Sequence, residues 1–268
     1  QNFDEIAGQE FVLRAIKNSL RENKLSHAYL FTGPRGVGKT TIARLIAKGV
    51  NCLSSEDVTD NPCGKCENCR EISSGISMDM IEIDAASNRG IDEIRELKEK
   101  INYQPVKGRK KIYIIDEVHM RTTAAFNALL KTLEEPPAHV IFILATTEIH
   151  KIPATILSRC QRFEFKNLSV EQLEDRLKYI SENERLDIEE DARKKIATLA
   201  KGGLIDAISI LDQVSNYSEK ITLENILEVT SSISEDSILE FYKYLLQGDV
   251  TKSLLMYNDF VAQAKDTK

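Results

Sequence analysis

The 268-residue sequence contains no tryptophan, and aromatic residues make up only 6% of it. Any hydrophobic core must therefore be built mainly from isoleucine, leucine, valine and alanine, which agrees with a hydrophobic content of 42%. No apolar run approaches the roughly 18 residues that a membrane-spanning helix needs, and the first residues lack the features of a secretory signal peptide. We therefore expect a cytoplasmic globular protein of about two domains with no membrane partner.

The sequence also lacks an excess of positive charge. Its net charge is −6, and residues 1–166 hold 24 Lys and Arg against 22 Asp and Glu, whereas residues 167–268 hold 12 against 20. Such a surface does not attract nucleic acid as a whole. Any contact with DNA must come from a local patch or from an assembly of several chains.

Short β-rich runs alternate with helical patterns over residues 1–166, which is typical of a parallel sheet covered on both faces. From residue 167 onward the β signal disappears, and Ser169 is a predicted N-cap at the joint. The fold class is therefore α/β with a five-stranded parallel sheet, followed by an all-α region. The predicted strands are 28–32, 80–84, 111–116, 140–147 and 162–165; the predicted helical faces are Val170, Leu173, Leu177 and Ile180, then Leu204, Ile208, Leu211 and Val214; two more helices are predicted within 232–246 and 249–264.

The stretch GPRGVGKT at 33–40 follows a predicted strand and opens a predicted helix, which is the setting of a phosphate-binding loop rather than of a chance glycine-rich turn. Its glycines let backbone N–H groups point at phosphates, and the helix adds its positive N-terminal end. Lys39 would neutralise phosphate charge, and Thr40 would offer a hydroxyl to Mg²⁺. The predicted ATP-binding residues are Gly33, Pro34, Arg35, Gly36, Val37, Gly38, Lys39, Thr40, Thr41 and Asp116.

The stretch IYIIDEVH at 112–119 places two carboxylates at the end of an apolar strand, where ligands bind in open α/β sheets. Asp116 would hold Mg²⁺ together with Thr40, and Glu117 would polarise the attacking water. An acidic helix cap is the simpler interpretation, but the phosphate loop makes it the weaker one. At the end of the next strand, Thr146 or Thr147 would reach the γ-phosphate or the water, unless its role is structural. We count Lys39, Glu117 and Thr146 as catalytic candidates.

Four of the five cysteines form the pattern C-x10-C-x2-C-x2-C at Cys52, Cys63, Cys66 and Cys69. Four thiolates suit a structural Zn²⁺ site, whereas an iron–sulfur cluster and disulfides or inert thiols are the alternatives. Between Cys52 and Cys69 only Leu53 and Val58 could form a core, too few to offset ordering costs of about 1–2 kcal/mol per residue. Structural Zn²⁺ supplies about 10–16 kcal/mol in small peptides. The sequence therefore predicts a zinc module over 52–69, with Cys160 as a packed thiol elsewhere.

Several stretches between residues 27 and 165 resemble AAA+ clamp-loader ATPases, and the gamma/tau family of bacterial DNA polymerase III is the best match. The specific ones are "PCGKCENCREI", "KIYIIDEVHM", "FNALLKTLEEPP" and "ILSRCQRFEF", in addition to the phosphate loop. The resemblance implies a nucleotide-binding domain over 1–166, a three-helix lid over 167–231 and the start of an oligomerising helical collar over 232–268. It also implies an ATPase that is part of the polymerase holoenzyme.

The resemblance implies further partners and roles. Other clamp-loader subunits would form a hetero-pentamer with this chain, which opens the sliding clamp and closes it around primer-template DNA. Polymerase and helicase would bind through a C-terminal region beyond residue 268. Arg159 of the "SRC" motif would reach in trans into a neighbour's ATP site. Asn88, Arg89 and the Met120–Thr122 segment are candidate DNA contacts.

One departure from the family pattern bears on hydrolysis. Ile205 stands where the family's lid normally carries an arginine toward the γ-phosphate, and isoleucine makes no such contact. A nucleotide-binding stator with little turnover is therefore the second hypothesis, although the Asp116–Glu117 pair speaks against it. Another AAA+ DNA motor, such as a branch-migration helicase, is the third, but the four cysteines and "LEEPP" do not fit it.

Overall fold

The computed structural model describes residues 2–87, 97, 99–230 and 235–262. The chain divides into two compact units, Gln1–Asn167 and Leu168–Lys268, and each is described by itself. Ser169 is the N-cap of the first helix of the second unit, where it forms a capping box with Gln172, so the predicted N-cap is confirmed. Among the described helices, none is long and apolar enough to cross a membrane.

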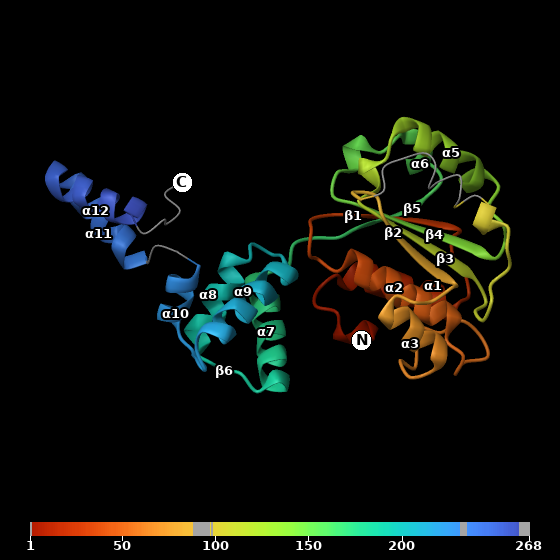
Figure 1. Cartoon of the computed structure of the whole chain (residues 1–268), viewed down its shortest axis with the longest axis horizontal. Helices are drawn as coiled ribbons and strands as arrows, with labels where there is room; N and C mark the ends of the chain where they lie inside the picture. Colours follow the sequence, from red (N-terminus) through yellow and green to blue (C-terminus); the bar gives the residue numbers. More distant parts are fainter. Residues whose placement is uncertain (1, 88–96, 98, 231–234, 263–268) are drawn as a thin grey trace. The chain divides into compact units, whose positions relative to one another are not determined.

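A five-stranded parallel sheet forms the centre of the first unit (Figure 1). The five predicted strands are confirmed, with one ending a residue early and the last shifted by one residue. The first and fourth strands are buried along their whole length because they lie in the interior of the sheet. The strands are β1 (Ala28–Thr32), β2 (Met80–Asp84), β3 (Lys111–Asp116), β4 (Val140–Thr146) and β5 (Gln161–Glu164), in the spatial order β2-β3-β4-β1-β5.

Helices cover both faces of this sheet (Figure 1). Successive strand residues alternate between two hydrophobic cores, so that Phe31 packs on one face and Leu30 on the other. The first unit also contains three short 3-10 helices among its described residues, η1 (Phe3–Glu5), η2 (Val118–Met120) and η3 (Ile149–Lys151). One face carries α1 (Glu10–Arg21), α2 (Lys39–Asn51) and α3 (Glu67–Ser74), and the other carries α5 (Thr123–Glu134) and α6 (Ala154–Leu157).

The parallel register brings the carboxyl ends of the strands to one edge of the sheet. Thr32 at the end of β1 is aligned with Thr146 at the end of β4, and Asp84 of β2 is aligned with Asp116 of β3. Because β4 lies between β1 and β3, the loops after all three strands meet at this edge. The fold therefore gathers the phosphate loop, the acidic pair and the threonine pair, which are far apart in the sequence.

The second unit is helical, with two differences from the prediction. Residues 170–229 form four helices rather than three, and a two-residue parallel ladder joins β6 (Asp187–Ile188) to β7 (Lys220–Ile221). Both features are too short to leave a periodic signal in the sequence. The helices are α7 (Val170–Glu184), α8 (Glu190–Leu199), α9 (Leu204–Tyr217) and α10 (Leu223–Val229).

The residues of α9 that face the core also differ from the predicted set. Ala207, Leu211 and Val214 are buried, whereas Ile208 is 39% exposed. The last two predicted helices are confirmed as α11 (Glu235–Leu246) and α12 (Val250–Ala262). They pack on each other through an edge-to-face contact between Phe241 and Phe260.

Candidate functional site

The loop between β1 and α2 has the backbone conformation that a phosphate cradle requires. Gly33, Gly36 and Gly38 have φ angles of 143°, 78° and 98°, which residues with a Cβ rarely adopt. At Gly33 a Cβ would also collide with the backbone carbonyl of Phe165, just after β5. Both the φ angle and the close approach of the Phe165 carbonyl therefore require glycine at this position.

Lys39 is held inside this loop. Its side chain is almost fully buried, and its ammonium donates hydrogen bonds to the carbonyl oxygens of Gly33 at 2.8 Å and Pro34 at 2.6 Å. Burial lowers the pKa of Lys39, while the negative charges of Glu117 and Asp116 oppose that shift. The lysine thus lies within the field of both predicted carboxylates.

A hydrogen bond joins the phosphate loop to the end of β3. The Thr40 hydroxyl donates to Asp116 Oδ2 at 2.7 Å, and the other Asp116 oxygen accepts from the N–H of Glu117 at 2.9 Å. Two oxygen donors that the sequence assigns to one Mg²⁺ are therefore in direct contact. Of the other predicted loop residues, Val37 is buried, Thr41 is half-buried, and Pro34 and Arg35 are exposed.

Glu117 has left-handed backbone geometry, with φ of 47°, and its carboxylate lies at the end of β4. Its Oε2 accepts from the hydroxyl of Thr147 at 3.1 Å. Thr146, the threonine that we counted as catalytic, is fully buried, and its hydroxyl contacts His119 rather than Glu117. The structure therefore brings Thr147 to the carboxylate and places Thr146 one layer behind.

Two residues near the site, His119 and Gln9, are not among the site residues predicted from the sequence. His119 lies 3.0 Å from the Thr146 hydroxyl, although its position in "DEVH" marks it as the first polar residue after the acidic pair. Gln9 forms two hydrogen bonds with the backbone of Lys166, at 2.7 and 3.1 Å, and its amide reaches the Val37 carbonyl at 3.5 Å. Gln9 therefore ties the N-terminal segment to both the loop and the end of the first unit.

Arg159 follows α6, and its described hydrogen bonds go to α5 and to the α6 turn rather than to the phosphate loop. Its guanidinium donates to Glu134 at 2.6 Å, to the Thr155 carbonyl at 2.7 Å and to the Ser158 hydroxyl at 3.3 Å. The pair with Glu134 is partly exposed. Cys160 beside it packs at the edge of a core, where burial raises its pKa to about 11.

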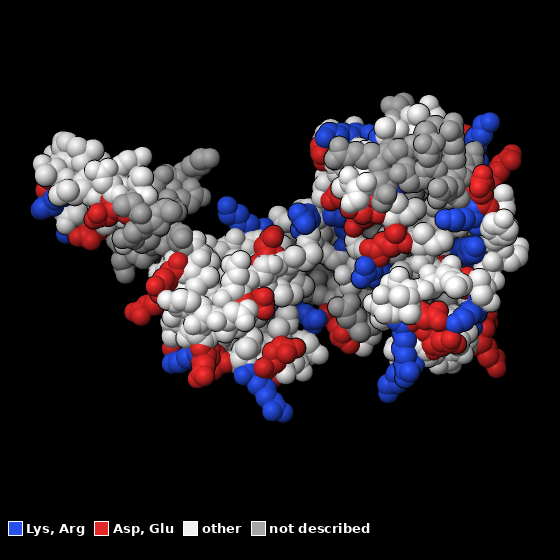
Figure 2. Space-filling model, in the orientation of Figure 1, with Lys and Arg blue, Asp and Glu red and all other residues white. Residues whose placement is uncertain are grey.

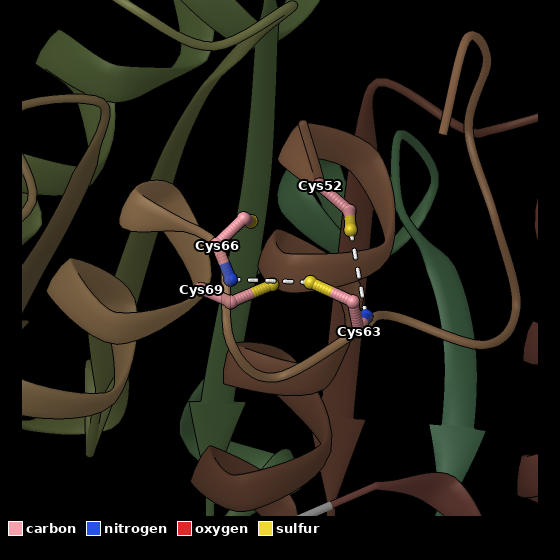
Figure 3. A group of neighbouring side chains, drawn as sticks. All are labelled: Cys52, Cys63, Cys66 and Cys69. Carbon is pink, nitrogen blue, oxygen red and sulfur yellow. Dashed lines mark hydrogen bonds between the residues drawn. The ribbon is translucent and has the colours of Figure 1, made fainter. Parts of the chain in front are cut away.

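The four clustered cysteines converge on one point (Figure 3). Their sulfurs all lie within 4.8 Å of one another, and every cysteine is a free thiol. Cys63 Sγ accepts hydrogen bonds from the Ser54 hydroxyl and from the N–H groups of Cys66 and Lys65, which lower its pKa to about 5. Burial instead raises the pKa of Cys69. The arrangement can hold one metal ion and leaves no position for a catalytic water.

Hydrogen bonds attach the cysteine module to the residues that precede β3. Arg109 donates to the carbonyl oxygens of Val50, Cys52 and Ser55. Asn51 accepts from the N–H groups of Arg109 and Lys110, at 2.9 and 3.0 Å. The module therefore connects the end of α2 to the sheet edge opposite the phosphate loop.

The proposed DNA contacts are only partly described. Asn88 and Arg89 lie outside the described residues. Arg121 is buried, and the Thr122 hydroxyl caps α5 by accepting from the N–H of Ala125. Acidic and basic side chains are interspersed on the face of the first unit seen in Figure 2, as the balanced charge of this region predicts.

These features define a P-loop NTPase of AAA+ architecture. Solved structures with this fold include the Thermotoga maritima RuvB Holliday junction branch migration motor, with a TM-score of 0.63 and 19% identity, covering 91% of this chain and 78% of that one. A point mutant of the same motor aligns with a TM-score of 0.62 at 18% identity, with the same coverage of both chains. At this level of identity the similarity establishes the fold alone.

Two family profiles match the chain: "DNA polymerase III, delta subunit" over residues 8–169, and "DNA polymerase III clamp loader subunit, ATPase lid domain" over residues 172–220. DNA polymerase III subunit gamma of Buchnera aphidicola subsp. Schizaphis graminum is 46% identical, over 96% of this chain and 71% of its own length. The chain belongs to the gamma/tau family of DNA polymerase III clamp-loader subunits.

Other relatives are longer than this sequence. DNA polymerase III subunit tau of Bacillus subtilis is 48% identical over 99% of this chain but only 47% of its own length. The tau subunit of Escherichia coli is 44% identical over 98% of this chain and 41% of its length. The chain therefore spans less than half the length of these relatives.

Proposed function

We propose that this protein binds and hydrolyses ATP as a motor subunit of the DNA polymerase III clamp loader, which loads the sliding clamp onto primed DNA during replication. The observation that carries this proposal is the hydrogen bond between Thr40 and Asp116 beside the buried Lys39. It unites the phosphate loop and the acidic strand end in one site, as hydrolysis of a nucleotide requires. Membership in the gamma/tau family supports the clamp-loading role.

In this proposal ATP lies along the loop with its β- and γ-phosphates against the backbone N–H groups and Lys39. Thr40 and Asp116 would hold Mg²⁺, which prefers oxygen ligands and would neutralise charge on the phosphate oxygens when bound. Glu117 polarises the attacking water, and the hydroxyl of Thr147 orients its carboxylate. Thr146 is fully buried behind Thr147 and Glu117, where its hydroxyl contacts His119.

Arg159 is assigned to a neighbouring subunit's site, where a guanidinium supplied in trans stabilises charge on the transferring phosphoryl group. Its position supports this role because its hydrogen bonds go to Glu134 and the α6 turn rather than to this chain's own phosphate loop. The pair with Glu134 is partly exposed, and such pairs contribute about 0–1 kcal/mol. The weak pair with Glu134 orients the Arg159 side chain and still allows it to reach a neighbouring subunit.

Cys52, Cys63, Cys66 and Cys69 are assigned to one structural Zn²⁺. The sulfurs are close enough together for a single ion, whose bonds to thiolates are about 2.3 Å long, and the N–H groups of Cys66 and Lys65 favour the thiolate form of Cys63. All four positions are sulfur, so the ion has no open position for chemistry. It would order a polar segment that lacks a core of its own.

The domain assignment follows the same proposal. Residues 1–166 form the nucleotide-binding domain, 167–231 the lid and 232–268 the start of the oligomerising collar. Other subunits, the sliding clamp and primer-template DNA are the proposed partners, in a hetero-pentamer that works in the cytoplasm.

A stator role is the second candidate because of Ile205. Its side chain is 57% exposed at the start of α9, where the family pattern has an arginine. A subunit without that contact could bind nucleotide and organise the pentamer while turning over slowly. Single-turnover hydrolysis in the assembly separates this candidate from the motor role. A branch-migration motor has only fold similarity behind it, and strand displacement by the protein alone would support it.

Lys39→Ala tests the proposal in a reconstituted clamp loader. We expect ATP-dependent clamp loading to be lost, because the phosphate charge is then not neutralised. Lys24→Ala, at an exposed lysine beside Glu22, is the control and should load clamps normally. Undiminished loading by Lys39→Ala would refute the motor role.

A further inference from the structure

His119 is a buried titratable residue beside the site that the proposed chemistry does not use. Its side chain is 6% exposed, although it lies in the short helix η2 directly after the Asp116–Glu117 pair. Nδ1 lies 3.0 Å from the Thr146 hydroxyl and 3.3 Å from Glu117 Oε2, and Nε2 lies 3.2 Å from Glu148 Oε1. A buried ring with polar atoms at both nitrogens is stable only when each nitrogen is satisfied.

The Thr146 hydroxyl is hydrogen-bonded on two sides. The N–H of Glu148 donates to the Thr146 hydroxyl at 3.0 Å, so the hydroxyl proton remains free to donate to His119 Nδ1. The hydrogen bond from Lys151 lowers the pKa of Glu148, and Glu148 Oε1 lies 3.2 Å from His119 Nε2, within ion-pair distance. Thr146, His119 and Glu148 thus form a closed ring of polar contacts around the imidazole.

This ring determines where Thr147 lies, because Thr147 is the residue between Thr146 and Glu148. Thr147 donates to Glu117 Oε2 through its hydroxyl at 3.1 Å and its N–H at 3.4 Å. These two hydrogen bonds from Thr147 orient the Glu117 carboxylate.

We propose that His119 is a positioning residue for ATP hydrolysis, which aligns Glu117 by fixing Thr146 and Glu148 on either side of Thr147. This inference rests on the proposed function, because it assumes that Glu117 polarises the attacking water. It predicts an effect on turnover and not on nucleotide affinity, since the imidazole contacts the ends of β3 and β4 rather than the phosphate loop. A misplacement of about 1 Å in a catalytic group costs on the order of 10²-fold in rate.

The test uses the full chain in a reconstituted clamp loader. His119→Leu is expected to lower the single-turnover rate of ATP hydrolysis by about 10–100-fold while the Kd for ATP stays within about twofold. His119→Gln is expected to recover most of the rate, because one amide offers both an acceptor for Thr146 and a donor for Glu148. His150→Ala is the matched control with an unchanged rate: His150 is 72% exposed and contacts the same Glu148 carboxylate at 3.4 Å.

Equal rates for His119→Leu and His119→Gln would overturn the proposal, because filling the space would then suffice. If circular dichroism shows that the leucine variant does not fold, Thr146→Val removes the same hydrogen bond from the other side. Thr146→Val should show the same selective loss of rate, and a normal rate there would also overturn the proposal. Glu117→Gln distinguishes the role of Glu117 from that of His119. Full hydrolysis by Glu117→Gln refutes the role of Glu117 in polarising water. An inactive Glu117→Gln together with a fully active His119→Leu refutes only the positioning role of His119.

Discussion

Gly33→Ala introduces two separate costs at the start of the phosphate loop. A φ of 143° is a conformation that alanine rarely adopts, and such backbone strain costs about 1–3 kcal/mol. The new Cβ would also lie 2.9 Å from the Cβ of Phe165 and closer still to its carbonyl oxygen. That oxygen belongs to the backbone after β5, so relief requires the chain to shift, and overpacking of this kind costs about 1–3 kcal/mol. We expect a total loss of about 2–6 kcal/mol in the free energy of unfolding.

Gly38→Ala supplies the matched control in the same loop. Its φ of 98° is also unfavourable for alanine, but a Cβ there would meet no atom within 4 Å. It should therefore cost only the backbone strain, and Gly33→Ala should be less stable by about 1–3 kcal/mol. Urea unfolding followed by far-UV circular dichroism and tyrosine fluorescence measures this difference, since the chain has no tryptophan. The same transition must be compared in both variants because the chain divides into two compact units. Equal stability would refute the argument from the Phe165 contact.

Two further predictions concern the metal and the neighbouring subunit. Cys63→Ser is expected to lower the zinc content measured by atomic emission well below one ion per chain, while Cys160→Ser leaves it unchanged; iron in place of zinc would contradict the assignment. Arg159→Ala is expected to lower DNA-stimulated ATP turnover of the assembly by at least about 10³-fold, with nucleotide binding by the isolated chain unaffected. Unchanged turnover would exclude the role in trans.

Local sequence patterns were sufficient wherever a feature is contiguous. The strands could be predicted because continuous apolar runs are needed when both faces of a sheet are covered. The phosphate loop could be predicted because its glycines, Lys39 and Thr40 act within one turn. The count of three lid helices was one short of the four observed, and the shortest of these, α10, has seven residues, too few for a helical period to show. Ile208 was misplaced because the buried face of α9 passes through the neighbouring Ala207.

The sequence by itself therefore determined the fold class, the nucleotide loop, the acidic pair and the cysteine cluster. Only the tertiary structure decided that Thr147 rather than Thr146 meets Glu117, that His119 closes a ring with Thr146 and Glu148, and that Arg159 pairs with Glu134. The reason is physical: adjacent residues at a strand end point to opposite sides, and which side faces the site depends on strand order and register. Those are set by packing between segments distant in the chain, and no local spacing records them.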